Sequence, residues 1–223
     1  MNRLKSKSSS APPRFSFTGL LSYRVIIIAL VIPVLFVCSC SQRSLQIKRA
    51  ERFYQQGQTY LAKGQHEKAL GKFNNSLALA RKIEFRSGVA HNLNEIGIIQ
   101  IKKGEYAKAR EYFYEAVSIY EQLEMDPEIS KSLNNIALSY VTAKDFEQAL
   151  QSYAKLLAWD EKTGNSLGMA ITANNMGHIF EQYFGDYKKA EKKYLQALKI
   201  FEELGKERLA RSVREKLKRL KSN

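Results

Sequence analysis

The sequence predicts an all-α protein built from antiparallel helix pairs that stack on one another, and two observations lead to this prediction. The first is that Pro is scarce, with four in 223 residues, three of them within the first 33. A long segment almost free of Pro and rich in Ala, Leu, Glu, Lys and Gln favours helix. The second is a set of small and aromatic residues that recurs about every 40 residues and stays in phase.

The recurring residues define four repeats, at about residues 50–89, 90–129, 130–169 and 170–210. The clearest positions are small residues, alanines, aromatic residues and turn residues, in that order: Gly57, Gly97, Ala137 and Gly177; Ala69, Ala109, Ala149 and Ala190; Phe73, Phe113, Tyr153 and Tyr194; Gly64, Gly104, Lys144 and Gly185. The fourth repeat carries one extra residue before Gly185, and all its later positions shift together.

The chemistry of these positions suits closely packed helix pairs. A Gly or Ala on each helix lets the two backbones approach, and the aromatic residue fills the space beside them. A turn glycine can adopt the left-handed conformation that ends a helix. Lys144 stands at this turn position in the third repeat, so it must adopt that conformation at a cost or end its helix differently.

Over about residues 48–205 this pattern resembles the tetratricopeptide repeat, in a 40-residue variant. The resemblance implies a right-handed superhelical solenoid of four antiparallel helix pairs whose first helices line a concave groove. Residues 206–223 place Leu209, Val213, Leu217 and Leu220 on one stripe with basic residues elsewhere, which predicts a basic capping helix. The alternative is an amphipathic helix that touches anionic lipid.

The N-terminal 39 residues predict a signal peptide or an uncleaved signal anchor. A basic segment precedes 14 apolar residues, Val25 to Cys38, fewer than the roughly 20 that span a bilayer. The run ends in Val37-Cys38-Ser39-Cys40, which resembles a bacterial lipobox and implies lipid attachment at Cys40, followed by a short tether over residues 40–47. Both interpretations place the repeats on a membrane in the bacterial envelope, facing the periplasm or the exterior. If the chain is a lipoprotein, the resemblance implies that Ser41 after the cysteine, in place of Asp, favours sorting to the outer membrane in Gram-negative bacteria.

The sequence offers little support for catalysis. The only cysteines are Cys38 and Cys40, so the repeats hold neither a disulfide nor a cysteine-based zinc site. No phosphate-binding loop or nucleophile motif occurs, and the pair His178 and Glu181 is interpreted as a solvated polar face. We therefore predict no enzyme activity, no cofactor and no metal. The formal net charge of +14 indicates an anionic partner, although nucleic acid fits poorly with an exported chain.

A column of polar residues on the first helices is the candidate binding site. It contains Tyr54, Asn94, Asn134 and Asn174. In kinesin light chain and related 40-residue repeats, such Asn columns hold the backbone of an extended peptide, since an amide is both donor and acceptor. The predicted peptide-binding residues are Asn94, Asn134, Asn174, Ile98, Leu138, His178, Lys102 and Lys131. Alternatively, the Asn residues only hydrogen-bond between neighbouring helices.

The prediction for function is a membrane-tethered protein–protein interaction scaffold. It would hold a peptide segment or protein partner in the concave groove and aid the assembly of an envelope complex. Two other functions remain open: a regulatory or sensor module, and an accessory subunit of an envelope enzyme.

Overall fold

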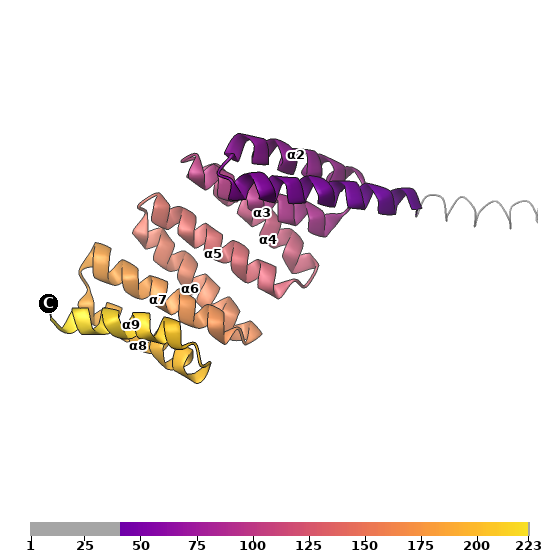
Figure 1. Cartoon of the computed structure of the whole chain (residues 1–223). Helices are drawn as coiled ribbons and strands as arrows, with labels where there is room; N and C mark the ends of the chain where they lie inside the picture. The colour runs from indigo at the N-terminus through magenta and orange to yellow at the C-terminus, as the bar shows by residue number, and fades with distance from the viewer. Residues whose placement is uncertain (1–40, 223) are drawn as a thin grey trace, which may run out of the picture. The chain divides into compact units, whose positions relative to one another are not determined.

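The computed structural model describes residues 41–222, and the regular elements of this part are all helical (Figure 1). The predicted signal segment and Cys40 lie outside the described residues. Among the described helices, none is both long enough and apolar enough to cross a membrane. The repeats belong to one compact unit, Gln46–Asn223.

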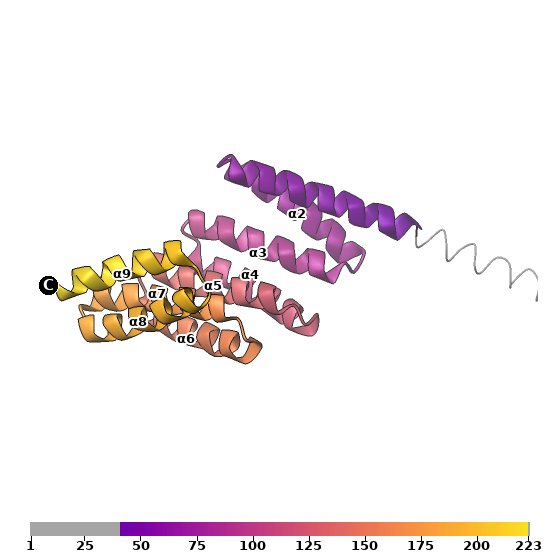
Figure 2. The same cartoon turned by 60° about the horizontal axis from the view of Figure 1, so that its bottom comes forward.

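The chain forms helix pairs in sequence order, and the two views show each pair stacked beside the next (Figures 1 and 2). Residues 41–62 form the first helix. The elements that follow are α2 (His66–Lys82), α3 (Arg86–Lys102), α4 (Tyr106–Gln122), α5 (Asp126–Thr142), α6 (Phe146–Thr163), α7 (Ser166–Ile179), the π-helical segment η1 (Phe180–Phe184), α8 (Tyr187–Glu203) and α9 (Glu207–Lys221). The predicted all-α solenoid of antiparallel helix pairs is therefore confirmed.

The repeat boundaries and the tether differ from those drawn on the sequence. Helices α3, α5 and α7 each start four residues before the predicted repeat boundary, because the boundaries followed the repeat phase and not the helix ends. Residues 41–47, assigned to a tether, are helical. Neither Gly nor Pro occurs between residues 41 and 56, so nothing in this segment interrupts the helix.

The two helices of a pair meet where a small residue faces an aromatic ring. A Cβ atom added to Gly97 would lie 2.6 Å from Cε1 of Phe113, whose side chain is fully buried. The same contact recurs in two other pairs, between Gly57 and Phe73 and between Gly177 and Tyr194. The backbones therefore approach as closely as the sequence pattern predicts, and the ring fills the space that a larger residue would need.

Left-handed residues end the helices at two sets of turns. The predicted set, within the pairs, has φ angles of 69°, 81°, 62° and 63° at Gly64, Gly104, Lys144 and Gly185. A second set, between the pairs, has φ angles of 55°, 54°, 70° and 64° at Glu84, Glu124, Gly164 and Gly205. The sequence did not reveal this second set, because Glu occupies two of its four positions.

Replacing Lys144 with Gly should raise the free energy of unfolding by roughly 1 kcal/mol, because a left-handed backbone costs a side-chain-bearing residue about 1–2 kcal/mol. The Lys144 side chain is exposed, so little packing is lost. Urea denaturation measures the change. The matched control is Gly104→Lys in the preceding pair, which should destabilise the protein. Equal midpoints for all three proteins would contradict the assignment of strain to this turn.

The fourth pair accommodates its extra residue in η1. The turn hydrogen bond there runs from the backbone N of Asp186 to the O of Phe180, whereas the equivalent bond in the third pair joins Asp145 to Tyr140. The wider π turn therefore contains the inserted residue and keeps α8 in phase with the other second helices. It also carries Glu181, which is buried.

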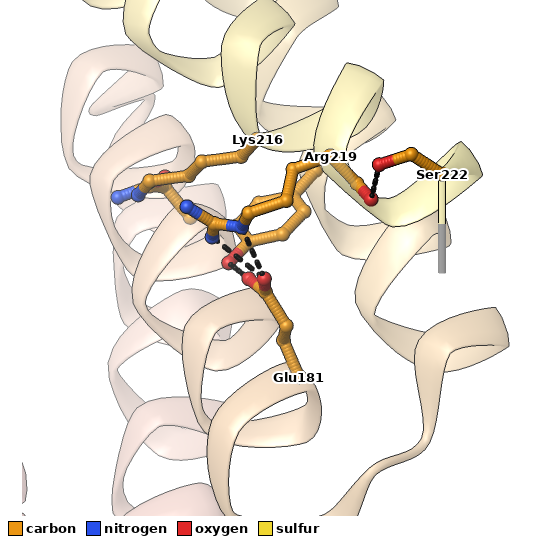
Figure 3. Close-up of polar contacts among 6 residues, drawn as sticks. Glu181, Lys216, Arg219 and Ser222 are labelled. Carbon is orange, nitrogen blue, oxygen red and sulfur yellow. Dashed lines mark hydrogen bonds and ion pairs between the residues drawn. The ribbon is translucent and has the colours of Figure 1, made fainter.

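Helix α9 covers the end of the stack, as predicted for a capping helix. Val213 and Leu217 are buried in a cluster with Tyr194 and Phe201 of α8. Its basic side chains also reach the fourth pair: Arg219 donates to Glu181 Oε1 at 2.6 Å (Figure 3). Glu181 Oε2 accepts a hydrogen bond of 2.6 Å from the buried hydroxyl of Tyr194. The cap is thus held by apolar burial and by one buried carboxylate.

Candidate peptide-binding groove

Two of the hollows in the described residues open side by side on the surface formed by residues 46–62, α3, α5 and α7, which we call the first-helix face. The first hollow has a volume of about 220 Å³ and the second about 290 Å³. Seven of the nine residues that line the first hollow lie 40 positions before a residue that lines the second. Pro127 and Lys131 line both. The two hollows are therefore the same site in successive repeats, joined along a shared wall.

The first hollow is aromatic and charged. The ring of His91 lies 6.1 Å from that of Tyr54 and 5.6 Å from that of Tyr120, centroid to centroid. Glu95 and Glu128 add carboxylates to the same lining. Burial lowers the pKa of His91, Glu128 opposes this, and the charge of Lys131 lowers it further.

Glu95 is the buried acid of the first hollow, with 6% of its surface exposed. Its Oε1 accepts a hydrogen bond of 3.3 Å from the Tyr54 hydroxyl and lies 3.9 Å from Nζ of Lys131. Both contacts are long for a charged group. Burial raises the pKa of Glu95, and Lys131 and Tyr54 only partly oppose that effect. The carboxylate is therefore weakly compensated by its own protein.

The second hollow is largely apolar. Leu167 and Ile171 of α7 are 37% and 40% exposed, and Leu156 of α6 lies behind them. The lining also includes Asp160, whose Oδ1 accepts hydrogen bonds from Ser130 at 2.7 Å and from Asn165. These bonds connect α5, α6 and the start of α7, so Asp160 fixes the walls of the hollow.

The predicted Asn column forms contacts between repeats. Oδ1 of the buried Asn94 accepts hydrogen bonds from Asn135 at 3.1 Å and from Ser132 at 3.2 Å, both on α5. In the fourth repeat, Oδ1 of Asn174 accepts a hydrogen bond of 2.8 Å from Nζ of Lys216 on α9. These two Asn side chains already bind their own chain, which supports the alternative in which the column connects neighbouring helices.

Asn134 is the exception in this column. It is half-buried and lines the second hollow, and within residues 41–222 its side chain has no hydrogen-bond partner. Of the three Asn residues, Asn134 is thus the one whose amide is available to a ligand.

Tetratricopeptide repeats are identified by comparison with a model of that family, which matches residues 41–122 and 128–203. The chain belongs to the tetratricopeptide repeat family. Proteins of this family are generally non-enzymatic scaffolds for protein–protein interaction, which supports that role for this tetratricopeptide repeat protein. No curated protein sequence matches the chain.

Solved structures share the fold of this tetratricopeptide repeat protein at low identity. The apo form of RapI matches with a TM-score of 0.68 and 16% identity, over 76% of this chain and 47% of RapI. A Rap protein complexed with competence and sporulation factor matches with a TM-score of 0.55 and 18% identity, over 76% of this chain and 53% of that protein. A putative kinesin light chain of Podospora anserina with nearly identical TPR-like repeats matches with a TM-score of 0.57 and 14% identity, over 79% of this chain and 96% of that chain. The chain thus spans about half the length of the two Rap proteins.

The structure brings only part of the predicted site together. Asn94 and Lys131 line the first hollow, and Lys131 and Asn134 line the second. The other predicted residues lie outside the lining of both hollows: Ile98, Leu138, His178, Lys102 and Asn174.

Other lining residues escaped prediction because they come from positions that the motif does not mark. Tyr120 lies at the end of a second helix, and Pro127 and Glu128 begin the next first helix. These positions could have been found by extending the 40-residue repeat to the residues at the helix ends.

Proposed function

We propose that this tetratricopeptide repeat protein is a membrane-tethered scaffold that holds a segment of a partner protein across the two hollows and so aids assembly of an envelope complex. One observation carries the proposal: the hollows are repeat-related and adjoin at Lys131. A row of equivalent sites suits a linear ligand, because each repeat can contact one part of the segment. The Rap protein complexed with competence and sporulation factor supports ligand binding on this fold.

A photo-crosslinking amino acid at position 171 tests the groove in the full-length chain in its native membrane. Ile171 lines the second hollow and is 40% exposed. Leu195 is the matched control, because it is 51% exposed on α8, a second helix. We expect a discrete adduct from position 171 and none from position 195. Mass spectrometry of the adduct identifies the partner and separates an assembly factor from a regulatory module or an enzyme subunit. Equal adducts from both positions would refute the groove.

The membrane tether has a separate test, because its evidence is the sequence of the N-terminal segment. Metabolic labelling with a fatty-acid analogue should label the chain, and Cys40→Ser should abolish the label. Cys38→Ser is the matched control and should keep it. Labelling that depends on Cys38, or no labelling of a membrane-bound chain, would favour the uncleaved anchor over the lipoprotein.

A further inference from the structure

We infer that the first hollow binds a basic side chain of the held segment and that the second hollow binds an aliphatic side chain two or three residues away. This inference rests on the proposed function and adds the chemistry of the ligand.

The three buried carboxylates of the described residues differ in how they are compensated. Glu181 accepts short bonds from Arg219 and Tyr194, each 2.6 Å. Asp160 accepts two bonds at Oδ1, but its Oδ2 has no hydrogen-bond partner and is buried against Gly168. Glu95 has only two long contacts, both at Oε1, and within residues 41–222 its Oε2 has no partner. A buried charge without a close partner is costly. The unpartnered oxygen of Asp160 is enclosed and that of Glu95 is not, so Glu95 is the acid that a cationic ligand can reach and stabilise.

The walls of the first hollow also suit a cation. Glu128 supplies a second carboxylate, and Lys131 is the one Lys or Arg among the lining residues that the structure describes. Lys131 is 61% exposed, so it can move aside into solvent. The faces of Tyr54 and Tyr120 attract ammonium and guanidinium groups. A Lys or Arg side chain would therefore find both charge and aromatic partners there.

The second hollow lacks the charged side chains of the first at two equivalent positions. Forty residues on, Glu128 is replaced by Gly168, and Lys131 by Ile171. Its acid, Asp160, is 1% exposed, and its unpartnered Oδ2 is buried, so a ligand in the hollow does not reach that oxygen. The exposed Leu167 and Ile171 provide an apolar surface that suits an aliphatic side chain, with Lys131 at the wall shared with the first hollow.

The spacing of the two side chains follows from helix packing. Helices α3 and α5 are in direct contact, and packed helices lie about 8–10 Å apart. An extended chain advances roughly 3.3–3.6 Å per residue, so one repeat corresponds to two or three residues of ligand.

Selection from a phage-displayed library of random heptapeptides tests this inference on the purified full-length chain. We expect enrichment of peptides with Arg or Lys followed or preceded, two or three residues away, by Leu, Ile or Val. Selection on Glu95→Gln should keep the aliphatic preference and lose the basic one. For a selected peptide, Glu95→Gln should weaken binding about 10- to 100-fold, because a charge-assisted bond is lost. Glu115→Gln, an exposed acid of α4 outside both hollows, is the control and should bind normally.

The stability of the Glu95→Gln variant separates a binding role of Glu95 from a structural one. Because burial raises the pKa of Glu95, the neutral Gln variant should be at least as stable as the parent at pH 7. Reduced stability together with weak binding would therefore overturn the inference. Enrichment of acidic peptides, or a basic preference that Glu95→Gln leaves intact, would also overturn it while leaving the proposed function standing. If none of the enriched peptides needed Ile171 for binding, both this inference and the proposed function would be contradicted.

Discussion

Phe113→Ala is expected to lower the free energy of unfolding by about 3–5 kcal/mol, the largest effect that we predict for one substitution. The ring is fully buried and lies against Gly97 on the other helix of the second pair. Because that pair lies in the middle of the stack, the cavity would weaken the packing on both sides. Guanidinium denaturation followed by circular dichroism measures the loss.

Tyr114→Ala is the control for this prediction. Tyr114 is the next residue of the same helix, is also aromatic, and is 50% exposed. Its removal should cost far less, because it leaves no internal cavity. If both variants lost equal stability, close packing of the ring against Gly97 would not be what holds the pair together.

Glu181→Ala is expected to cost about 1–3 kcal/mol at pH 7, because the buried hydroxyl of Tyr194 loses its acceptor and α9 loses its contact through Arg219. Burial acts to raise the pKa of Glu181, but the hydrogen bonds from Tyr194 and Arg219 and the charge of Arg219 outweigh it. The pKa therefore lies below its usual value of 4.5. Thermal unfolding at several pH values measures the effect.

The sign of the pH dependence follows from this lowered pKa. The folded protein binds a proton less readily than the unfolded chain, so the stabilisation is complete above pH 4.5 and is lost as the pH falls through the folded value. The difference between the parent and Glu181→Ala should therefore shrink in acid. Glu202→Ala, which removes an exposed partner of Arg214, is the control and should cost much less at any pH. A difference that stays constant down to acid pH would contradict the ionised pair.

Some contacts of the fold could be predicted from the sequence, and others could not. The packing of Gly97 on Phe113 and the turn at Gly104 were predictable, because each depends on a residue type at a fixed spacing within one helix pair. The left-handed conformation of Glu124 was not predictable, since Glu is not a residue type that favours this conformation. The Asn column was found, but not the fact that Asn94 already binds Asn135.

The sequence by itself determined the helix pairs, their order and the cap, because helix periodicity, turn residues and repeat phase are local properties of the chain. Only the tertiary structure decided which polar groups meet across repeats and which stay uncompensated. Tyr54, Glu95 and Lys131 come from three different repeats, and their distances depend on how the helices stack. The first hollow exists only after that stacking, since neighbouring repeats supply its walls.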